Sequence, residues 1–231
     1  MATRAQRAER RTDALSKERI VEAAIGILDT EGEKGLTFRT LAARLATGAG
    51  AIYWHVANKD ELLAAATDGV VTRVVTDVGR GEEPREGIRA LALGVFDAID
   101  VHPWVGTQLS REPWGSALLQ IFEGLGGRLQ ELGVPRSEQL NSASALLNYV
   151  LGAAAQNAAN ARLPLPVGTD RSTFLGGIAA RWTELDAARH PFLRQVAAEL
   201  PEHDDREQFL AGIDLILMGI GAYGAGSLTE S

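Results

Sequence analysis

Residues 36–63 constrain the fold of this chain more than any other stretch of its sequence. Thr37 is a suitable N-cap, and the apolar residues after it recur at helical spacing, which predicts a first short helix. The sequence TGAG at 47–50 breaks that helix, and residues 51–55 are expected to form the next one. Asn58, with a glutamate three positions later, predicts the capped start of a longer helix. This layout is typical of a helix-turn-helix, whose second helix lies in the major groove of DNA.

The polar and aromatic side chains left over in this stretch suit contact with DNA. Tyr53, Trp54 and His55 follow one another, which is more large polar-edged groups than one side of a small core absorbs. Lys59 lies at the N-terminus of the longer helix, where free N–H groups and the helix dipole favour a phosphate. The guanidinium of Arg39 can donate two hydrogen bonds to a guanine.

Together these residues resemble the DNA-binding domain of the TetR family of bacterial repressors. The resemblance covers about 60 N-terminal residues, and YWHVANKDELL at 53–63 is especially similar to the tetracycline repressors. It implies a mostly helical homodimer with an N-terminal helix-turn-helix domain and a C-terminal ligand-binding domain. By family position, Arg39 matches a base-reading arginine. The positions that match contacts to the DNA backbone are Thr37, Tyr53, Trp54, His55 and Lys59. The full set of residues expected to bind DNA is Thr37, Phe38, Arg39, Thr40, Gly48, Ala49, Gly50, Ala51, Tyr53, Trp54, His55 and Lys59.

One part of this stretch departs from the family pattern. Residues 48–51 read GAGA, where relatives often carry longer polar side chains. Few side chains there can reach the edges of bases in the groove. We therefore expect Arg39, Tyr53 and a basic arm at residues 1–14 to carry more of the sequence specificity.

The distribution of charge also fits a chain that presents one end to DNA. The net charge is −7, which by itself argues against a nucleic-acid binder. Residues 1–60, however, contain 10 Lys or Arg and 8 Asp or Glu, a balance of +2, so the remainder carries −9. A mildly basic head on an acidic body is the expected footprint of such a protein.

The sequence has no cysteine, which excludes a disulfide framework and a thiolate metal site. Its polar start, MATRAQRAERRTDALS, lacks the apolar core of a secretory signal, and its acidic residues argue against a transit peptide. The most apolar helix expected, at residues 205–224, is short and contains Asp214, which argues against a membrane span. We expect a cytoplasmic protein without a membrane-bound part.

The rest of the chain shows helical patterns, with no strand pattern of any length and no internal repeat. An all-α fold is therefore expected. Residues 1–14 form a basic arm, which is either a solvated tail or a source of phosphate and minor-groove contacts. Residues 15–78 form the helix-turn-helix domain with its connecting helix. The sequence GRGEEP at 79–84 predicts a linker, so that residues 79–231 form a C-terminal ligand-binding and dimerisation domain.

Two helices of this C-terminal domain carry more apolar or small-residue surface than a monomer readily exposes. Residues 136–162 are rich in alanine, glycine, serine and asparagine, and residues 205–224 are apolar nearly all round. Pairing each of them with its symmetry mate predicts a homodimer with a four-helix interface. The alternative is that both helices lie at the centre of the monomer core.

Polar and aromatic residues on otherwise apolar helices predict a pocket for a small molecule. The stretch HPWVGTQLSREPWGS at 102–116 resembles the corresponding part of tetracycline-repressor-like C-terminal domains, where a histidine helps to bind the drug–magnesium complex. His102 alone is an insufficient reason to expect that ligand here. The residues expected to bind an effector are His102, Trp104, Gln108, Trp114, Phe122, Asn148, Gln156, Asn157 and Trp182.

Other chemistry is not indicated. The acidic run EHDD at 202–205 precedes a helix, so helix capping explains it better than metal binding. No nucleophile–base motif, phosphate loop or zinc-ligand spacing is present, so no catalytic residue, metal or cofactor is expected. We therefore predict a homodimeric repressor that binds an operator in double-stranded DNA and is released by a small hydrophobic or aromatic effector. The alternatives are a DNA-binding regulator without an effector, and a helical enzyme or carrier domain fused to a helix-turn-helix head.

Overall fold

The computed structural model describes residues 15–78, 83–112, 114–166 and 168–226. The described residues contain helices and no strand, so the predicted all-α fold is confirmed. The basic arm predicted at 1–14 lies outside the described residues. The elements are α2 (Lys17–Gly35), α3 (Phe38–Arg44), α4 (Ala49–Tyr53), α5 (Lys59–Asp77), α6 (Pro84–Val101), α7 (Pro103–Arg111), α8 (Ser116–Glu131), α9 (Arg136–Asn160), α10 (Arg171–Thr183), α11 (Pro191–Val196), the 3-10 helix η1 (Ala197–Glu202) and α12 (Asp205–Gly226).

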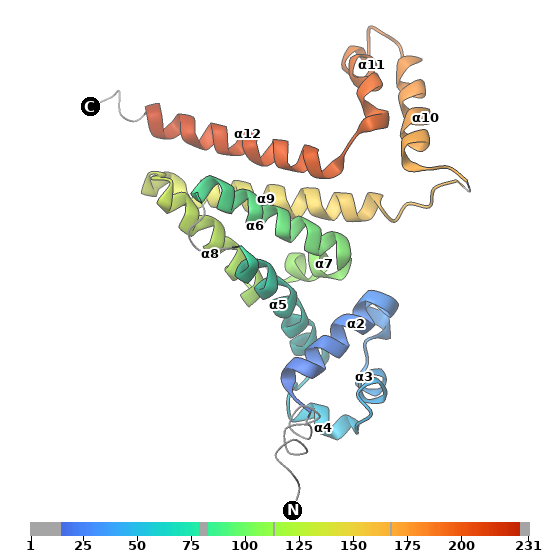
Figure 1. Cartoon of the computed structure of the whole chain (residues 1–231), viewed down its shortest axis with the longest axis vertical. Helices are drawn as coiled ribbons and strands as arrows, with labels where there is room; N and C mark the ends of the chain where they lie inside the picture. The colour runs from blue at the N-terminus through green and yellow to red at the C-terminus, as the bar shows by residue number, and fades with distance from the viewer. Residues whose placement is uncertain (1–14, 79–82, 113, 167, 227–231) are drawn as a thin grey trace, which may run out of the picture.

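The helices fall into a small N-terminal head and a larger body (Figure 1). The head consists of α2, α3 and α4, and α5 leads from it into the body. In the body, α6, α9 and α12 run side by side, with α8 packed across α6 and α9. The elements α10, α11 and η1 pack mainly against one another and stand away from the other helices.

The helix starts of the head follow the local capping signals. The side chain of Ser16 accepts a hydrogen bond from Arg19 N at the start of α2. Thr37 and Thr40 form a reciprocal capping box at the start of α3, with the hydroxyl of each accepting from the backbone N–H of the other. At the start of α5, Asn58 Oδ1 accepts from Glu61 N at 2.8 Å. The caps predicted at Thr37 and Asn58 are present, because each needs only residues within one helical turn.

The second helix of the helix-turn-helix begins earlier than expected. It was predicted over residues 51–55, and α4 runs from Ala49 to Tyr53 with Gly48 as its N-cap. The turn before it is made by Ala46, which has a φ of 50°. Because Ala46 adopts the left-handed conformation, the chain has already reversed when it reaches Gly48, and α4 starts there.

One hydrophobic core runs from the head into the body. In the head it contains Ile20, Leu28, Leu41 and Ile52, all nearly inaccessible to solvent. The buried face of α5 continues it along residues 62–71. Helix α5 packs against α2 in the head and against α6 and α8 in the body, so it joins the two parts of the molecule.

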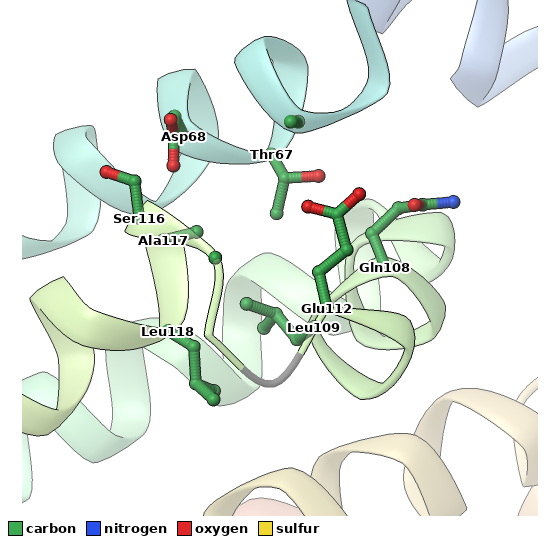
Figure 2. A pocket seen from close by; sticks show the side chains of 10 residues that line it. Thr67, Asp68, Gln108, Leu109, Glu112, Ser116, Ala117 and Leu118 are labelled. Atoms are coloured by element: carbon green, nitrogen blue, oxygen red, sulfur yellow. The ribbon is translucent and has the colours of Figure 1, made fainter. Parts of the chain in front are cut away.

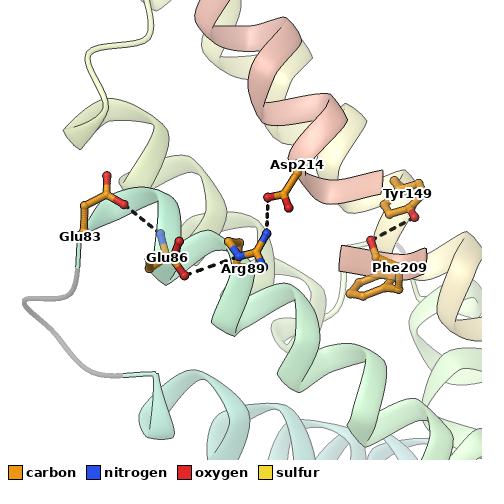
Figure 3. Close-up of polar contacts among 6 residues, drawn as sticks. All are labelled: Glu83, Glu86, Arg89, Tyr149, Phe209 and Asp214. Carbon is orange, nitrogen blue, oxygen red and sulfur yellow. Dashed lines mark hydrogen bonds and ion pairs between the residues drawn. The ribbon is translucent and has the colours of Figure 1, made fainter. Parts of the chain in front are cut away.

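The contact between α9 and α12 depends on one glycine. The hydroxyl of Tyr149 on α9 donates a hydrogen bond to the carbonyl of Phe209 on α12 at 3.1 Å (Figure 3). The ring of Phe209 stacks on Tyr149 and on Phe96 of α6. A Cβ atom at Gly212 would lie 2.0 Å from the hydroxyl oxygen of Tyr149. Any residue other than glycine at position 212 would therefore push the ring of Tyr149 away and disturb the contact between α9 and α12.

A polar contact fixes α12 against α6 beside this aromatic cluster. Arg89 on α6 forms an ion pair with Asp214 on α12 and a second one with Glu86 one turn earlier (Figure 3). The sequence predicts one short helix from Pro191 to Leu200, and the structure divides this stretch into α11 and η1, which contains Pro201. In the EHDD run, Asp204 accepts hydrogen bonds from Arg206 N and Glu207 N, so it caps α12 as expected.

Pro113 suits the first position of a helix, so the sequence predicts a helix from there, and α8 starts three residues later. Residue 113 lies outside the described residues, and α8 begins at Ser116 with Gly115 as its N-cap. No side chain within its own turn caps this helix. The carboxylate of Asp68 on α5 lies beside the free N–H groups at this helix start (Figure 2).

Candidate functional site

The outer end of the head carries exposed groups that its core does not use. Helices α3 and α4 form the end of the molecule farthest from α12 (Figure 1). Arg39 on α3 is exposed, and Tyr53 and Trp54 at the end of α4 are 54% and 90% exposed. An exposed tryptophan gains nothing from the folding of the monomer, so a surface that keeps it exposed is a candidate binding surface.

Tyr53 has a structural contact as well. Its ring stacks on Phe38 with centroids 4.3 Å apart and ring planes inclined by 5°. Phe38 lies on α3 and packs against the core, so the pair joins the two helices of the motif. One face of Tyr53 is therefore occupied, while its other face and Trp54 remain open to a partner.

The start of α4 is nearly bare of side chains. Gly48 and Gly50 are exposed, and a Cβ atom at either would meet no atom within 4 Å. Ala49 and Ala51 are half-buried. Close packing therefore does not explain the two glycines. They leave the start of α4 without side chains, at the position where the recognition helix of a helix-turn-helix approaches DNA.

Lys59 and His55 are less available than the sequence predicts. Lys59 Nζ donates a hydrogen bond to the carbonyl of Glu33 on α2 at 2.6 Å. His55 is half-buried, and its backbone N–H donates to Ile52. Thr37 is exposed, but its hydroxyl belongs to the capping box of α3. The structure thus brings Arg39, Tyr53 and Trp54 to the open surface and ties Lys59 to α2.

Helix α7 of the body is joined to α2 of the head by a set of polar contacts, which we call the α2–α7 seam: Asp29 and Glu33 with His102, Trp104, Gln108 and Arg111. Asp29 Oδ1 lies 2.7 Å from His102 Nδ1 and accepts from Trp104 Nε1 at 2.8 Å. Glu33 Oε2 accepts from Arg111 at 2.7 Å. A longer contact of 3.5 Å joins it to the amide of Gln108.

No local sequence pattern marks the seam. Its partners are more than 70 residues apart in the chain, as the separations of 73 for Asp29 with His102 and 78 for Glu33 with Arg111 show. Asp29 and Glu33 read as ordinary surface acids on a helix. Only the docking of the body onto the head brings them against α7.

The nine residues predicted to bind an effector lie at separate places. His102 and Trp104 belong to the seam, and Asn157 donates a hydrogen bond to Asp100 at 2.9 Å. Trp114 is exposed, and Phe122 packs half-buried against the core. The other exposed or half-buried positions are Asn148 and Gln156 on α9 and Trp182 on α10. Three of the nine line pockets, and each lines a different one: His102, Trp104 and Gln108.

The pocket beside Gln108 is too small for an effector. It has a volume of about 20 Å³, room for about one water molecule. Asp68 on α5 and Glu112 after α7 line it (Figure 2). The carboxylate of Asp68 faces Ser116 and the backbone N–H of Ala117, at the start of α8. It thus supplies the cap that α8 lacks within its own turn.

The burial of Asp68 predicts a dependence of stability on pH. Burial raises the pKa of Asp68 above its ordinary value, and the hydrogen bonds from Ser116 and Ala117 offset part of that rise. Because the folded state then binds the proton more tightly than the unfolded state, the ionised carboxylate costs stability at neutral pH. That cost disappears as the pH falls below the folded-state pKa. We expect Asp68→Asn to raise the melting temperature at pH 7.

The difference in melting temperature between Asp68→Asn and the parent should shrink as the pH approaches about 4. Thermal unfolding followed by circular dichroism at several pH values measures it. Asp186→Asn is the control for the general effect of removing a carboxylate. Asp186 lies in an exposed turn, where its side chain accepts hydrogen bonds from Ala188 N and Arg189 N. A constant difference at all pH values would contradict the assignment of burial as the main cause.

Three larger grooves open on the surface. One of about 530 Å³ lies between α5 and α6 and is lined by two arginines and two aspartates, Arg73, Arg206, Asp77 and Asp97. A second of about 480 Å³ combines three basic residues with Glu31 and Glu33 beside the seam. A third of about 660 Å³ lies between α7 and α9. All three have the size of small-molecule sites.

In the described part of the chain, the helices are too short or too polar to cross a membrane. The same residues contain no group of three histidines or acids placed to hold a metal ion.

A helix-turn-helix head with exposed basic and aromatic groups, joined to a grooved helical body, defines a class of protein: bacterial transcription regulators with a separate regulatory domain. Two sequence families match the chain in the same order. Residues 20–66 match the bacterial regulatory proteins of the tetR family, and residues 80–223 match the tetracyclin repressor-like C-terminal domain. The chain belongs to the TetR family of bacterial regulatory proteins.

Named relatives agree with this membership. The chain is 33% identical over 150 residues to an HTH-type transcriptional regulator of Saccharopolyspora erythraea, an alignment that covers 64% of each chain. It is 29% identical over 215 residues to the HTH-type transcriptional repressor DrrR1 of Streptomyces coeruleorubidus, covering 89% of this chain and 77% of DrrR1.

Solved structures share the fold. The transcriptional regulator SCO7222 from Streptomyces coelicolor is 52% identical with a TM-score of 0.83, covering 90% of this chain and 99% of that one. ActR from Streptomyces coelicolor, in complex with actinorhodin, is 28% identical with a TM-score of 0.72, covering 92% and 99%. BioQ with its double-stranded DNA operator is 31% identical with a TM-score of 0.55, covering 64% and 89%.

Proposed function

We propose that the chain is a homodimeric transcriptional repressor of the bacterial cytoplasm. It binds a palindromic operator through two helix-turn-helix heads and releases it when a small hydrophobic or aromatic effector binds the body. The observation that carries this function is the exposed group of Arg39, Tyr53 and Trp54 at the free end of the head. The similar protein BioQ was solved with its operator, which supports a DNA partner for this surface.

The outer faces of α9 and α12 support the homodimer. On α9, exposed positions recur at helical spacing at Asn141, Ala145, Asn148 and Gly152, opposite the buried face of the same helix. On α12, Leu215 and Met218 are 66% and 57% exposed.

Because α9 and α12 pack against each other, a second copy can cover the exposed faces of both helices at once. A second copy covering them would form a four-helix interface and remove these apolar side chains from water.

A dimer also makes binding to a palindrome possible. One short recognition helix with alanine and glycine at its start makes few contacts to bases. Two heads placed about 34 Å apart contact successive major grooves on one side of the duplex. The affinity of both heads together then exceeds that of one by far, because the second binding event is intramolecular.

The grooves of the body support an effector. ActR, which shares the fold, was solved with actinorhodin. Helix α5 connects the head to α6 and α8 of the body and lines one of the grooves together with α6, so a ligand that shifts α5 changes the separation of the two heads. A coupling free energy of about 1–3 kcal/mol would change operator affinity roughly 5–150-fold.

Selection from a random pool of duplexes tests this function. We expect the purified protein to enrich a palindrome whose half-sites lie about one helical turn apart. The affinity for that duplex should fall steeply with salt concentration, because bound phosphates release counterions. A pool without enrichment, or an affinity independent of salt, would contradict the proposed function.

A further inference from the structure

The groove between α7 and α9 differs from the other pockets in its charge. Arg111, at the end of α7, and Arg162, just after α9, line it, and no aspartate or glutamate does. The other two grooves combine basic with acidic residues, and the small pocket beside Asp68 is acidic. In a chain of net charge −7, this is an unusually positive place for a small anion.

The remaining lining of the groove is mostly apolar. Ile99 and Pro103 contribute from the α6–α7 corner, and the alanines of α9 at 155, 158 and 159 contribute from the other side. The hydroxyls of Thr107 and Ser110 add two polar groups on α7. The volume of about 660 Å³ is ample for a small molecule. An apolar lining with two guanidinium groups suits a ligand with an apolar body and one carboxylate.

Two residues of this groove also hold the head. Arg111 forms the ion pair with Glu33, and Trp104 donates to Asp29. Glu33 lies where three elements meet, because its backbone carbonyl also accepts from Lys59 Nζ at the start of α5. The α2–α7 seam and the groove therefore share the side chains of Arg111 and Trp104. A ligand that binds Arg111 in the groove would change the contacts of the seam.

We propose, as a refinement of the effector-responsive function above, that this groove is the effector site for an amphipathic carboxylate, which competes with Glu33 for Arg111. The ion pair is open to exchange, since the side chains of Arg111 and Glu33 are 56% and 36% exposed. Surface ion pairs contribute little net stability because water competes for both partners. A carboxylate in the groove replaces Glu33 as the partner of Arg111 and gains Arg162 as a second cationic partner.

Release of Glu33 loosens the seam at the end of α2. This end follows the interruption of the helix at Gly32, whose φ is 68°. The head then loses one of its attachments to α7, which leaves α5 as its main connection to the body. Linkage requires the reverse effect as well: weakening the Arg111–Glu33 pair must strengthen binding of the carboxylate.

The test uses the intact protein and sodium decanoate as the probe, with decanol as its uncharged counterpart, both measured by calorimetry. We expect Arg162→Gln to weaken decanoate binding about tenfold, since a charge-assisted contact is lost. Glu33→Gln should strengthen it about threefold, because Arg111 no longer has a competing partner. Decanol binding should respond to neither change.

Glu22→Gln is the matched control for Glu33→Gln. Glu22 lies on the same helix and pairs with Arg73 on α5, away from the α7–α9 groove, so decanoate binding should stay at the parent value. Thr107→Phe, at an exposed position of the groove, should weaken decanoate and decanol alike. This variant separates filling of the groove from loss of charge.

The inference is overturned if the folded parent does not bind decanoate, if decanol binds equally well, or if Glu33→Gln leaves the affinity unchanged. Duplex binding by the same preparation is measured separately. Failure to bind any duplex would remove the proposed function and leave the groove measurements valid. Normal duplex binding with unchanged decanoate affinities in all variants would remove only the groove assignment.

Discussion

Arg39→Ala is expected to weaken operator binding by at least about 30-fold, because the proposed dimer would lose one base-reading arginine per half-site, worth about 1–3 kcal/mol each. Trp54→Ala should weaken it as well. Its side chain is 90% exposed, so its removal takes away contact area with DNA and no core packing. Both variants should melt at the parent temperature, since neither residue is part of the buried core.

Fluorescence anisotropy with the selected operator measures this loss, with thermal melting as the check on folding. Arg181→Ala is the matched control, because it removes an exposed arginine from α10, far from the head. Tyr53→Ala is less clean, since it also removes the stack on Phe38. Parent-like affinity in both Arg39→Ala and Trp54→Ala would place the DNA surface elsewhere on the protein.

The double change Leu215→Glu and Met218→Glu is expected to convert the dimer into monomers and to reduce operator affinity by roughly 100-fold or more, because a single head binds DNA without the second. Both positions are exposed in the single chain, so the monomer should keep its fold. In the dimer, the new carboxylates would be buried without partners across the symmetry axis, which strongly disfavours association.

Sedimentation velocity at micromolar concentration measures the oligomeric state, and circular dichroism checks the helical content. Leu119→Glu on α8 is the control, because it places the same charge at another exposed leucine, on a different helix. A dimer that survives the double change would show that α9 and α12 are not the interface. The placement of the two heads would then need another explanation.

The head was predictable because its signals act over one helical turn. Thr37 and Asn58 each form a hydrogen bond with a residue three positions away, and the apolar residues between them have one buried face. The start of α4 was predicted two residues too late. Gly48 and Gly50 indicated the turn, but Ala46 adopts the left-handed conformation instead. At this point the N–H of Thr47 donates to the carbonyl of Ala42 at 3.0 Å, a backbone contact typical of a helix that ends in a left-handed residue.

The residues predicted to bind an effector do not lie together in the structure, and the sequence pattern could not show this. His102 and Trp104 were expected to line a pocket because polar and aromatic groups stand out on an apolar helix. In the structure both contact Asp29 of the head, and each also lines a groove, but the two grooves are different. Asn148 and Gln156 lie on the outer face of α9. Which face of a helix meets a cavity depends on how the helix is rotated against its neighbours, and periodicity alone does not fix that rotation.

The sequence by itself determined the all-α class, the helix-turn-helix with its caps, and the two helices with surplus apolar surface, because capping and amphipathic spacing are properties of adjacent residues. Only the tertiary structure decided the α2–α7 seam, the cap that Asp68 of α5 supplies to α8, and the positive groove that shares Arg111 with Glu33. These features join side chains from helices far apart in the chain. Their positions follow from the packing of the whole core, which brings the head and the body together.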